Sequence, residues 1–478
     1  MKKYLPIILI LFSISLGLFI TLININRSIV EGDEVIHSIV AQGLAFYGDS
    51  YLKPIYFGDS YLQKPPLQIW GTSILLKVFG DQNWVYRVLP AMFGFGTFIL
   101  LIYAGKLFFN NIWIGILALF LLLGAPQVFF DHGIKLGVQD SALLFGSTLA
   151  ILGAWQLLYK NKKATSIVSI SIGLIIGTMV KWVSGLIPVI VYSCFLINKE
   201  FRGALFKNLN KFSIAILLGG IPVASFICFY YLNDPLAIKD GLFGSLNTRL
   251  MGEGYHNRFA INLYIDSILK GLYGSQYLII FGTFCSLFFF KKFKQELLYL
   301  YLWWFLPLII FSFLSSRNVW YFLPAVPGLL ITTSYGIISL LNFLKNKTIL
   351  IRLLILLSVC IVCGNRIYIN CKRAFNTTKF VKIDDFANSI INSSNQGIQL
   401  INIDHLKRNS KHITRREAFY IRKIYHSKGQ PVIDLKLALI KKDSVTLKDN
   451  TYKFRNCINL EKKKSDYLIC SYSKLKVS

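Results

Sequence analysis

Long apolar runs separated by short polar stretches occupy most of the chain before residue 370. Each run is about 15 to 23 residues long, which suits an α-helix that crosses a bilayer. The runs lie near residues 4–23, 88–105, 112–130, 141–158, 166–180, 182–197, 212–232, 272–290, 296–314, 319–341 and 349–365. The pattern therefore predicts a mainly α-helical, polytopic membrane protein with about eleven or more transmembrane helices.

The first two runs are separated by an unusually long polar segment, residues 24–87. Within it, residues 35–46 and 67–79 carry apolar side chains at helical spacing, and aromatic residues are frequent. Tyrosine and tryptophan favour the headgroup zone of a bilayer. We therefore predict helices that lie along the membrane surface in this loop, within a transmembrane domain that comprises residues 1–370.

The pattern changes near residue 376, where lysine-rich, alternating sequence replaces the long apolar runs. Short strands are predicted at residues 397–403, 437–440 and 467–473, and helices near residues 380–391 and 415–426. Residues 376–478 are thus predicted to form a small α/β domain. Cys457 and Cys470 in this domain could form a disulfide, although their spacing alone does not establish one.

Composition and charge set the class of partner. The chain is 54% hydrophobic, and its formal net charge is +29. Such a charge would suggest nucleic acid in a soluble protein, but no RNP, zinc-finger or basic-zipper pattern accompanies it. Membrane proteins concentrate Lys and Arg in cytoplasmic loops, and the basic clusters here alternate from loop to loop. The alternation predicts a cytoplasmic N-terminus, an outer first loop and an outer tail, with membrane lipids and not nucleic acid as partners.

Charged residues gather on the outer side of this topology. Asp33 and Glu34 follow the first apolar run, Lys64 lies in the same loop, and Asp140 begins a later run. Acidic residues beside a bilayer are costly to hold, so they are usually paired, bound to a ligand or catalytic. An acid and a base on one face of a membrane protein indicate chemistry on a charged lipid.

Several short motifs occur in order along the first 340 residues. They are Asp33-Glu34, Tyr61-Leu62-Gln63-Lys64-Pro65-Pro66-Leu67, Phe79-Gly80 with Arg87 and Pro90, Gln139-Asp140, Lys181 with Gly185 and Pro188, and Tyr321-Phe322-Leu323-Pro324-Ala325-Val326-Pro327. In this order and spacing the chain resembles the GT-C superfamily of membrane glycosyltransferases, which use a polyprenyl-phosphate sugar as donor. It is most similar to the aminoarabinose (lipid A) transferases and the protein O-mannosyltransferases.

The resemblance implies transfer of a sugar from a polyprenyl-phosphate-linked donor to lipid A, a glycan or a protein at the outer face of a cell inner membrane. In such an inverting reaction an acceptor attacks the anomeric carbon and the polyprenyl phosphate leaves. A carboxylate can accept the acceptor's proton or stabilise the positive charge on the sugar. Cationic side chains hold the phosphate and stabilise its growing charge.

The resemblance also implies roles for the acids. The catalytic acid of the family's first loop matches Asp33, and the acid at the start of the fourth helix matches Asp140. Glu34 is a candidate second acid beside Asp33.

Four basic residues are candidates for binding the donor phosphate. The family's lysine that contacts the carrier phosphate matches Lys64, and its later arginine matches Arg249 best, with Arg258 as the alternative. Lys181 is a further candidate.

The chain departs from the family at two positions. Gln63 stands where the aminoarabinose transferases have a glutamate implicated in metal binding, and Ile36 stands where the family often has arginine. A neutral amide is a poor replacement for a carboxylate ligand. A divalent metal is therefore left open as a cofactor, and the sugar and the acceptor are left open as well.

Structural explanations compete with these roles. Asp33 and Asp140 could instead cap helices. Glu34 could interact with a helix dipole, and Lys64 and Lys181 could contact lipid headgroups. At the level of function, the main alternative is a flippase or transporter of lipid-linked sugars, which would favour internal repeats and charges inside the membrane.

The histidines receive no site role at this stage. His37 and His256 are predicted to be ordinary loop histidines, and Asp131 and His132, which follow an apolar run, are predicted to be structural.

Overall fold

The computed structural model describes residues 4–27, 29, 32–56, 59–160, 162–196, 198–244, 247, 265, 269, 272, 275–313, 318–346, 348–376, 399–400, 436–441, 452–459 and 467–474. The chain divides into two compact units, which are described separately. The first comprises Met1–Ile25, Leu62–Gln68 and Arg87–Phe375, and the second comprises Asn26–Tyr61, Ile69–Tyr86 and Asn376–Ser478.

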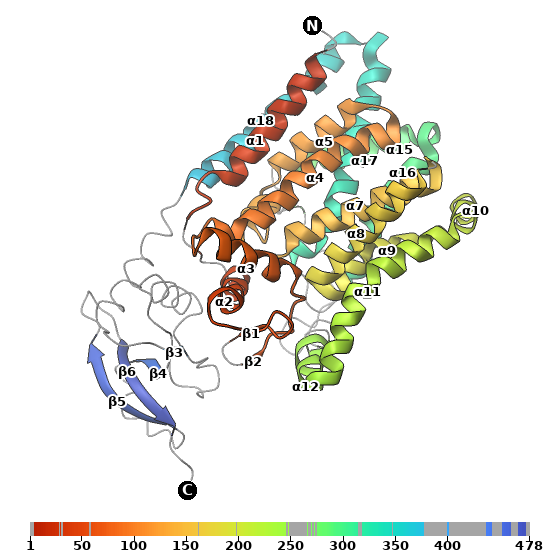
Figure 1. Cartoon of the computed structure of the whole chain (residues 1–478). Coiled ribbons are helices and arrows are strands. Elements are labelled where there is room, and N and C mark those ends of the chain that lie inside the picture. Colours follow the sequence, from red (N-terminus) through yellow and green to blue (C-terminus); the bar gives the residue numbers. More distant parts are fainter. Residues whose placement is uncertain are drawn as a thin grey trace. The chain divides into compact units, whose positions relative to one another are not determined.

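The first unit consists mainly of helices, many of them long and apolar (Figure 1). They are α1 (Leu5–Leu22), α4 (Val85–Phe109), α5 (Ile112–Gly124), α6 (Pro126–Phe130), α7 (Asp140–Tyr159), α8 (Lys163–Lys181), α9 (Ile187–Ser193), α10 (Lys199–Lys207), α11 (Leu209–Asn233), α12 (Pro235–Ala237), α15 (Gln276–Phe288), α16 (Lys294–Ser312), α17 (Val326–Phe343) and α18 (Ile349–Phe375). Shorter helical turns are η1 (Trp182–Leu186), η2 (Cys194–Leu196), η3 (Ile238–Phe243), η4 (Phe290–Phe293), η5 (Val319–Ala325) and η6 (Leu344–Asn346).

Within the described ranges, eight helices are long and apolar enough to cross a membrane, and three shorter helices are also apolar. The mainly helical, membrane-spanning class is therefore confirmed, whereas the number of about eleven spans stays a prediction. The predicted run at 182–197 is divided into the short helical segments η1, α9 and η2. It is set off from α8 by the backbone of Trp182, which has φ 34°. Pro188 then lies at the start of α9, where its missing N–H is tolerated.

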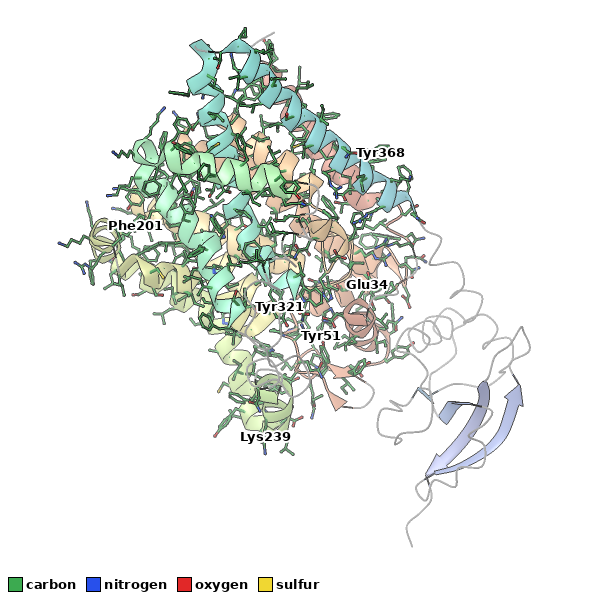
Figure 2. All side chains as sticks on the ribbon, turned by 180° about the vertical axis from the view of Figure 1, so that it is seen from behind. Glu34, Tyr51, Phe201, Lys239, Tyr321 and Tyr368 are labelled. Atoms are coloured by element: carbon green, nitrogen blue, oxygen red, sulfur yellow. The ribbon has the colours of Figure 1, made fainter. Side chains whose placement is uncertain are left out.

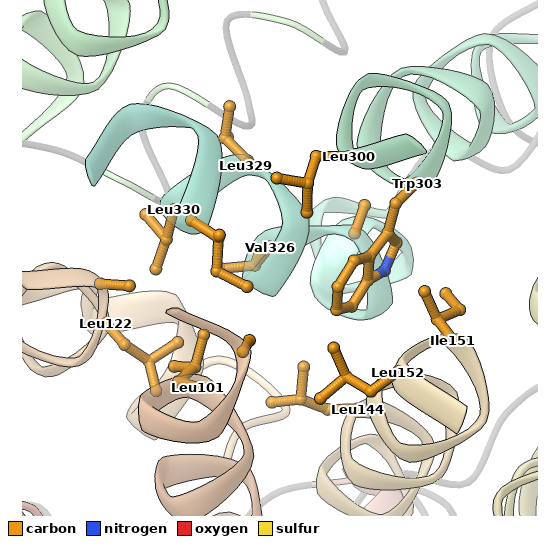
Figure 3. Packing of buried hydrophobic residues seen from close by; sticks show 14 of the residues in the cluster. Leu101, Leu122, Leu144, Ile151, Leu152, Leu300, Trp303, Val326, Leu329 and Leu330 are labelled. Carbon is orange, nitrogen blue, oxygen red and sulfur yellow. The ribbon is translucent and has the colours of Figure 1, made fainter. Parts of the chain in front are cut away.

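Part of the core of the first unit lies between α4, α5, α7, α16 and α17 (Figure 3). Trp303 of α16 is completely buried, and its indole Nε1 donates a hydrogen bond of 2.9 Å to the carbonyl of Pro324 in η5. A buried indole N–H needs such a partner. Ile151 and Leu152 of α7 and Val326 of α17 belong to the same core. The packing therefore holds η5 close to α16.

Helices α7 and α8 approach closely because glycines face each other between them. A Cβ atom on Gly173 would lie 2.5 Å from the carbonyl oxygen of Gly146, closer than real Cβ contacts allow. Small residues at such positions let helix backbones meet. This approach brings the start of α7 near the end of α8.

In the second unit, the first loop folds into α2 (Gly32–Phe46), β1 (Ile55–Tyr56), β2 (Asp59–Ser60) and α3 (Leu67–Phe79), of which residues from 69 onward belong to this unit. The two helices predicted in this loop are confirmed as helices, and their position along a membrane surface stays a prediction. Asp81 accepts hydrogen bonds from Tyr86 Oη at 2.6 Å and from Gln42 Nε2 at 3.0 Å. These bonds join α2 to the turn after α3.

The tail contains a four-stranded sheet in the order β3–β4–β6–β5, in which β3 and β4 are parallel and the other pairs antiparallel. Its strands are β3 (Gln399–Leu400), β4 (Lys436–Lys441), β5 (Tyr452–Asn459) and β6 (Tyr467–Lys474). Three strands overlap the predicted ones, and β5 was not predicted. The helices predicted near 380–391 and 415–426 lie outside the described residues, so the α/β domain stays a prediction.

Strands β5 and β6, which pair antiparallel, each carry one cysteine. The register shifts between Arg455 and Ile458, a stretch that contains Cys457, and Cys470 lies in the opposing part of β6. Opposed residues of antiparallel strands have Cα atoms about 4.5–5.5 Å apart, a separation that a disulfide can span. We therefore predict that these cysteines form a disulfide in an oxidising compartment.

Mass spectrometry of a non-reduced proteolytic digest should find the two cysteine peptides linked, and a reductant should separate them. Cys371, a free thiol on α18, is the internal control and should be alkylated without reductant. Alkylation of Cys457 and Cys470 without reductant would contradict the prediction.

Candidate active site

Asp140 begins α7 and lies at the centre of a polar cluster in the first unit. Its Oδ1 is 2.5 Å from Nζ of Lys181, the last residue of α8, and its Oδ2 is 3.6 Å from Nδ1 of His132. The side chain of Asp140 is only 2% exposed, and Lys181 is buried as well. Charges buried in this way are stable only when they are paired. The ion pair therefore fixes the start of α7 against the end of α8.

Neither helix capping by Asp140 nor contact of Lys181 with lipid headgroups describes how these two side chains lie. Gln139 is the N-cap of α7, and Asp140 is its first helical residue, with its carboxylate on Lys181. The Lys181 ammonium is buried against Asp140, so it is not extended towards lipid headgroups.

His132 is the residue that the sequence argument missed. Its ring stacks on Trp320 of η5, with centroids 3.9 Å apart and an interplanar angle of 16°. Its backbone φ is 56°, in the left-handed region that few non-glycine residues adopt. The stacked ring presents Nδ1 to Asp140. His132 is therefore part of the Asp140 cluster. The sequence-based expectation of a structural residue did not include this contact with Asp140.

The η5 turn supplies a second aromatic ring to the cluster. Tyr321, labelled in Figure 2, has its ring centroid 5.9 Å from Nζ of Lys181. A cation at this distance is attracted by an aromatic ring. The Tyr-Phe-Leu-Pro motif noted in the sequence thus lies next to the Asp140–Lys181 pair.

The segment that carries Lys64 is held against the start of α7. Gln139 Nε2 donates a hydrogen bond of 3.1 Å to the carbonyl of Pro65, and both groups are buried. Leu67 packs against a small apolar cluster that includes Leu143 of α7. Lys64 itself is half-buried. The first unit therefore brings Lys64, Asp140 and Lys181 into one region through contacts between neighbouring residues.

Asp33 and Glu34 belong to the second unit. Both lie in the first turn of α2, which begins at Gly32. Asp33 is half-buried, and Glu34 is completely buried. The alternative in which Asp33 caps a helix starting near Val35 does not fit, because the helix begins at Gly32 and Asp33 lies inside it. Acids in the first turn of a helix interact favourably with its dipole. For both carboxylates, this structural explanation therefore stands alongside a catalytic role.

The two predicted arginines, Arg249 and Arg258, lie outside the described residues, as does His256. Their roles stay predictions.

Two further basic side chains bind the end of α1, and neither role was foreseen from the sequence. Lys135 Nζ donates hydrogen bonds of 2.7 Å to the carbonyls of Ile20 and Ile23. Arg87 Nη1 donates one of 2.8 Å to the carbonyl of Ile25. The last carbonyls of a helix lack partners within the helix, and cations satisfy them well. These residues therefore fix the point where the chain leaves α1 for the first loop.

The donor set does not fit a divalent metal. In the part of the chain that the structure describes, no group of three or more His, Cys, Asp or Glu residues could hold one. Gln63, at the position of the family's metal-linked glutamate, is an exposed neutral amide. Such an amide is a weak ligand compared with carboxylate or imidazole. We therefore assign no metal-dependent step to these residues.

Comparison with known proteins relates this site to a family. The family model "Dolichyl-phosphate-mannose-protein mannosyltransferase" matches residues 45–236, a range that contains Lys64, Asp140 and Lys181. The family resemblance drawn from the sequence is confirmed. Among curated proteins, none matches the chain.

Solved structures share the fold. The crystal structure of ArnT from Cupriavidus metallidurans bound to undecaprenyl phosphate superposes with a TM-score of 0.72 at 13% identity, over 97% of each chain. The oligosaccharyltransferase AglB from Archaeoglobus fulgidus, in complex with an inhibitory peptide and a dolichol-phosphate, gives a TM-score of 0.57 at 13% identity. That match covers 81% of this chain and 58% of AglB. The chain therefore has the fold of these membrane proteins.

Proposed function

We propose that this protein is a glycosyltransferase that moves a sugar from a polyprenyl-phosphate-linked donor to a lipid, glycan or protein acceptor. The observation that carries the proposal is the mannosyltransferase family match across the segments that join Lys64 to the Asp140–Lys181 pair. The ArnT-like fold adds support, because that ArnT structure holds undecaprenyl phosphate.

The proposed reaction is a direct, inverting displacement. Asp33 accepts the acceptor's proton or stabilises the positive charge that develops on the sugar. Because Lys181 already binds the Asp140 carboxylate, at 2.5 Å, Asp140 is the weaker candidate for accepting that proton. Lys64, Lys181 and Arg249 would hold the phosphate and stabilise its charge as it leaves. Gln139, next to Asp140, holds the Lys64 segment through its hydrogen bond to the carbonyl of Pro65.

A transfer assay tests the proposed function. Membranes containing the protein are supplied with labelled polyprenyl-phosphate sugars, and label is followed into lipid, glycan and protein fractions. We expect transfer above the level of matched membranes without the protein. If no such donor gives transfer, the protein would be better explained as a flippase of lipid-linked sugars.

The proposed topology has about eleven spans in a cell inner membrane, with the first loop and the tail on the outer face. Cysteines introduced at two exposed positions test it, in a variant whose native cysteines are replaced. A membrane-impermeant maleimide should label Lys53→Cys in intact cells, because Lys53 is exposed and the proposed topology puts the first loop outside. Arg202→Cys in α10, the matched cytoplasmic control, should react only after lysis. The reverse labelling pattern would invert the topology.

A further inference from the structure

His132 is a titratable side chain in the candidate site that the proposed reaction leaves without a role. Its side chain is 22% exposed, so protons can exchange with water. One edge of the ring faces the Asp140 carboxylate and one face lies on Trp320. Histidine is the side chain whose charge changes most readily between about pH 5 and pH 8. The ring is thus a group of the cluster that can exist in a neutral or a protonated form.

The charged groups around the His132 ring determine the net charge of the cluster when the ring is protonated. Asp140 and Lys181 together carry no net charge, and Tyr321 faces Lys181 from η5. Asp131 precedes His132 in the chain and interacts with it electrostatically. Asp131 also interacts electrostatically with Arg373 of α18. The positive charge of Arg373 offsets the negative charge of Asp131. A protonated His132 therefore adds one positive charge to a nearly balanced cluster.

Protonation also changes the contact with Asp140. A neutral ring whose Nδ1 carries no hydrogen presents a lone pair to Asp140 Oδ2, whereas an imidazolium presents an N–H donor. The 3.6 Å separation can then shorten into a charge-assisted hydrogen bond. The carboxylate would be shared between His132 and Lys181, so that more of the Lys181 ammonium is free to attract an anion.

We propose that His132 is a positioning residue whose protonated form strengthens binding of the polyprenyl phosphate group at the Asp140–Lys181 cluster. This inference rests on the proposed function, because it takes the bound anion to be the phosphate of the lipid carrier. Trp320 holds the imidazole in the required plane by stacking. Gln139, bonded to Pro65, holds the Lys64 segment beside the same cluster.

Binding of undecaprenyl phosphate to the purified full-length protein in detergent tests the proposal. The dissociation constant is measured at about pH 5.5 and pH 8, on either side of the range where imidazole titrates. Between the two pH values, the dissociation constant of the wild type should rise about 3- to 10-fold more than that of His132→Gln. This difference is about half to one order of magnitude, and it measures how strongly phosphate binding and protonation of His132 favour each other. The ligand's own titration cancels in this comparison between variants.

Two further variants sharpen the result. His132→Lys keeps a positive charge at both pH values and should bind as tightly at pH 8 as at pH 5.5, apart from the ligand's own titration. Lys163→Met removes an exposed cation at the other end of α8 and should behave as the wild type. If His132→Gln does not purify as a folded protein, His132→Lys carries the test alone.

The outcomes separate the two proposals. A pH dependence in His132→Gln or His132→Lys equal to that of the wild type would overturn the role of His132 and leave the glycosyltransferase proposal standing. A wild type that does not bind undecaprenyl phosphate at either pH would overturn both.

Discussion

Asp33→Asn is expected to lower the rate of sugar transfer by about 10²- to 10⁴-fold, the usual contribution of a positioned acid or base. The amide keeps the shape of the carboxylate but neither accepts a proton at neutral pH nor stabilises a positive charge. Asp33 lies in the first turn of α2 and is half-buried, so the substitution should be tolerated by the fold. The measurement is the initial rate of labelled sugar transfer in membranes with equal amounts of protein.

Asp81→Asn is the matched control, because it makes the same chemical change in the same unit. Asp81 is bonded to Tyr86 and Gln42, which assigns it a structural role. Its substitution should lower thermal stability and leave the transfer rate of the folded protein within a few-fold of the wild type. Undiminished transfer by Asp33→Asn would remove Asp33 from the reaction.

The helical part of the fold could be predicted from the sequence because spanning helices are long and apolar. The run at 141–158 corresponds to α7 (Asp140–Tyr159), and the run at 212–232 corresponds to α11 (Leu209–Asn233). The break after Lys181 was visible only as two short runs. Strand β5 was missed because polar residues interrupt Tyr452–Asn459 and an irregularity near Cys457 shifts its alternation.

Residues of the candidate site could be predicted from the sequence only where the residue type and its place beside an apolar run suggest a role. Lys64 and Asp140 stood out as charges beside apolar runs. His132 did not, because its role depends on a stack with Trp320, far along the chain. The hydrogen bonds of Lys135 to the end of α1 were equally invisible. Contacts between distant segments depend on packing, which no local pattern encodes.

Lys181 is an example of a residue whose contact could not be predicted from the sequence. From the sequence, contact with headgroups and a place in the site were equally good explanations for a lysine at a helix end. The place of Lys181 in the site stays a prediction, but headgroup contact is disfavoured by Asp140, 41 residues away in the chain, whose carboxylate lies 2.5 Å from the ammonium. The close approach of α7 and α8 at Gly146 and Gly173 makes that contact possible.

The Asp140–Lys181 pair leads to the second large expected effect, on stability. Asp140→Asn and Lys181→Met should each destabilise the protein by about 3–5 kcal/mol, because each leaves the partner's charge buried and unpaired. The double variant removes both charges and should recover most of the lost stability. Free energies of unfolding in detergent, measured for the four proteins, give the interaction energy as a double-mutant cycle.

The same four proteins distinguish a structural bridge from a functional one. If the pair helps to bind the donor, the double variant should be stable and yet transfer sugar poorly. Lys163→Met, which removes an exposed lysine from the other end of α8, should change stability by no more than about 0.5 kcal/mol and leave transfer intact. A double variant with wild-type transfer would mean that the pair only joins two helices. Single variants as stable as the wild type would mean that the two charges do not depend on each other.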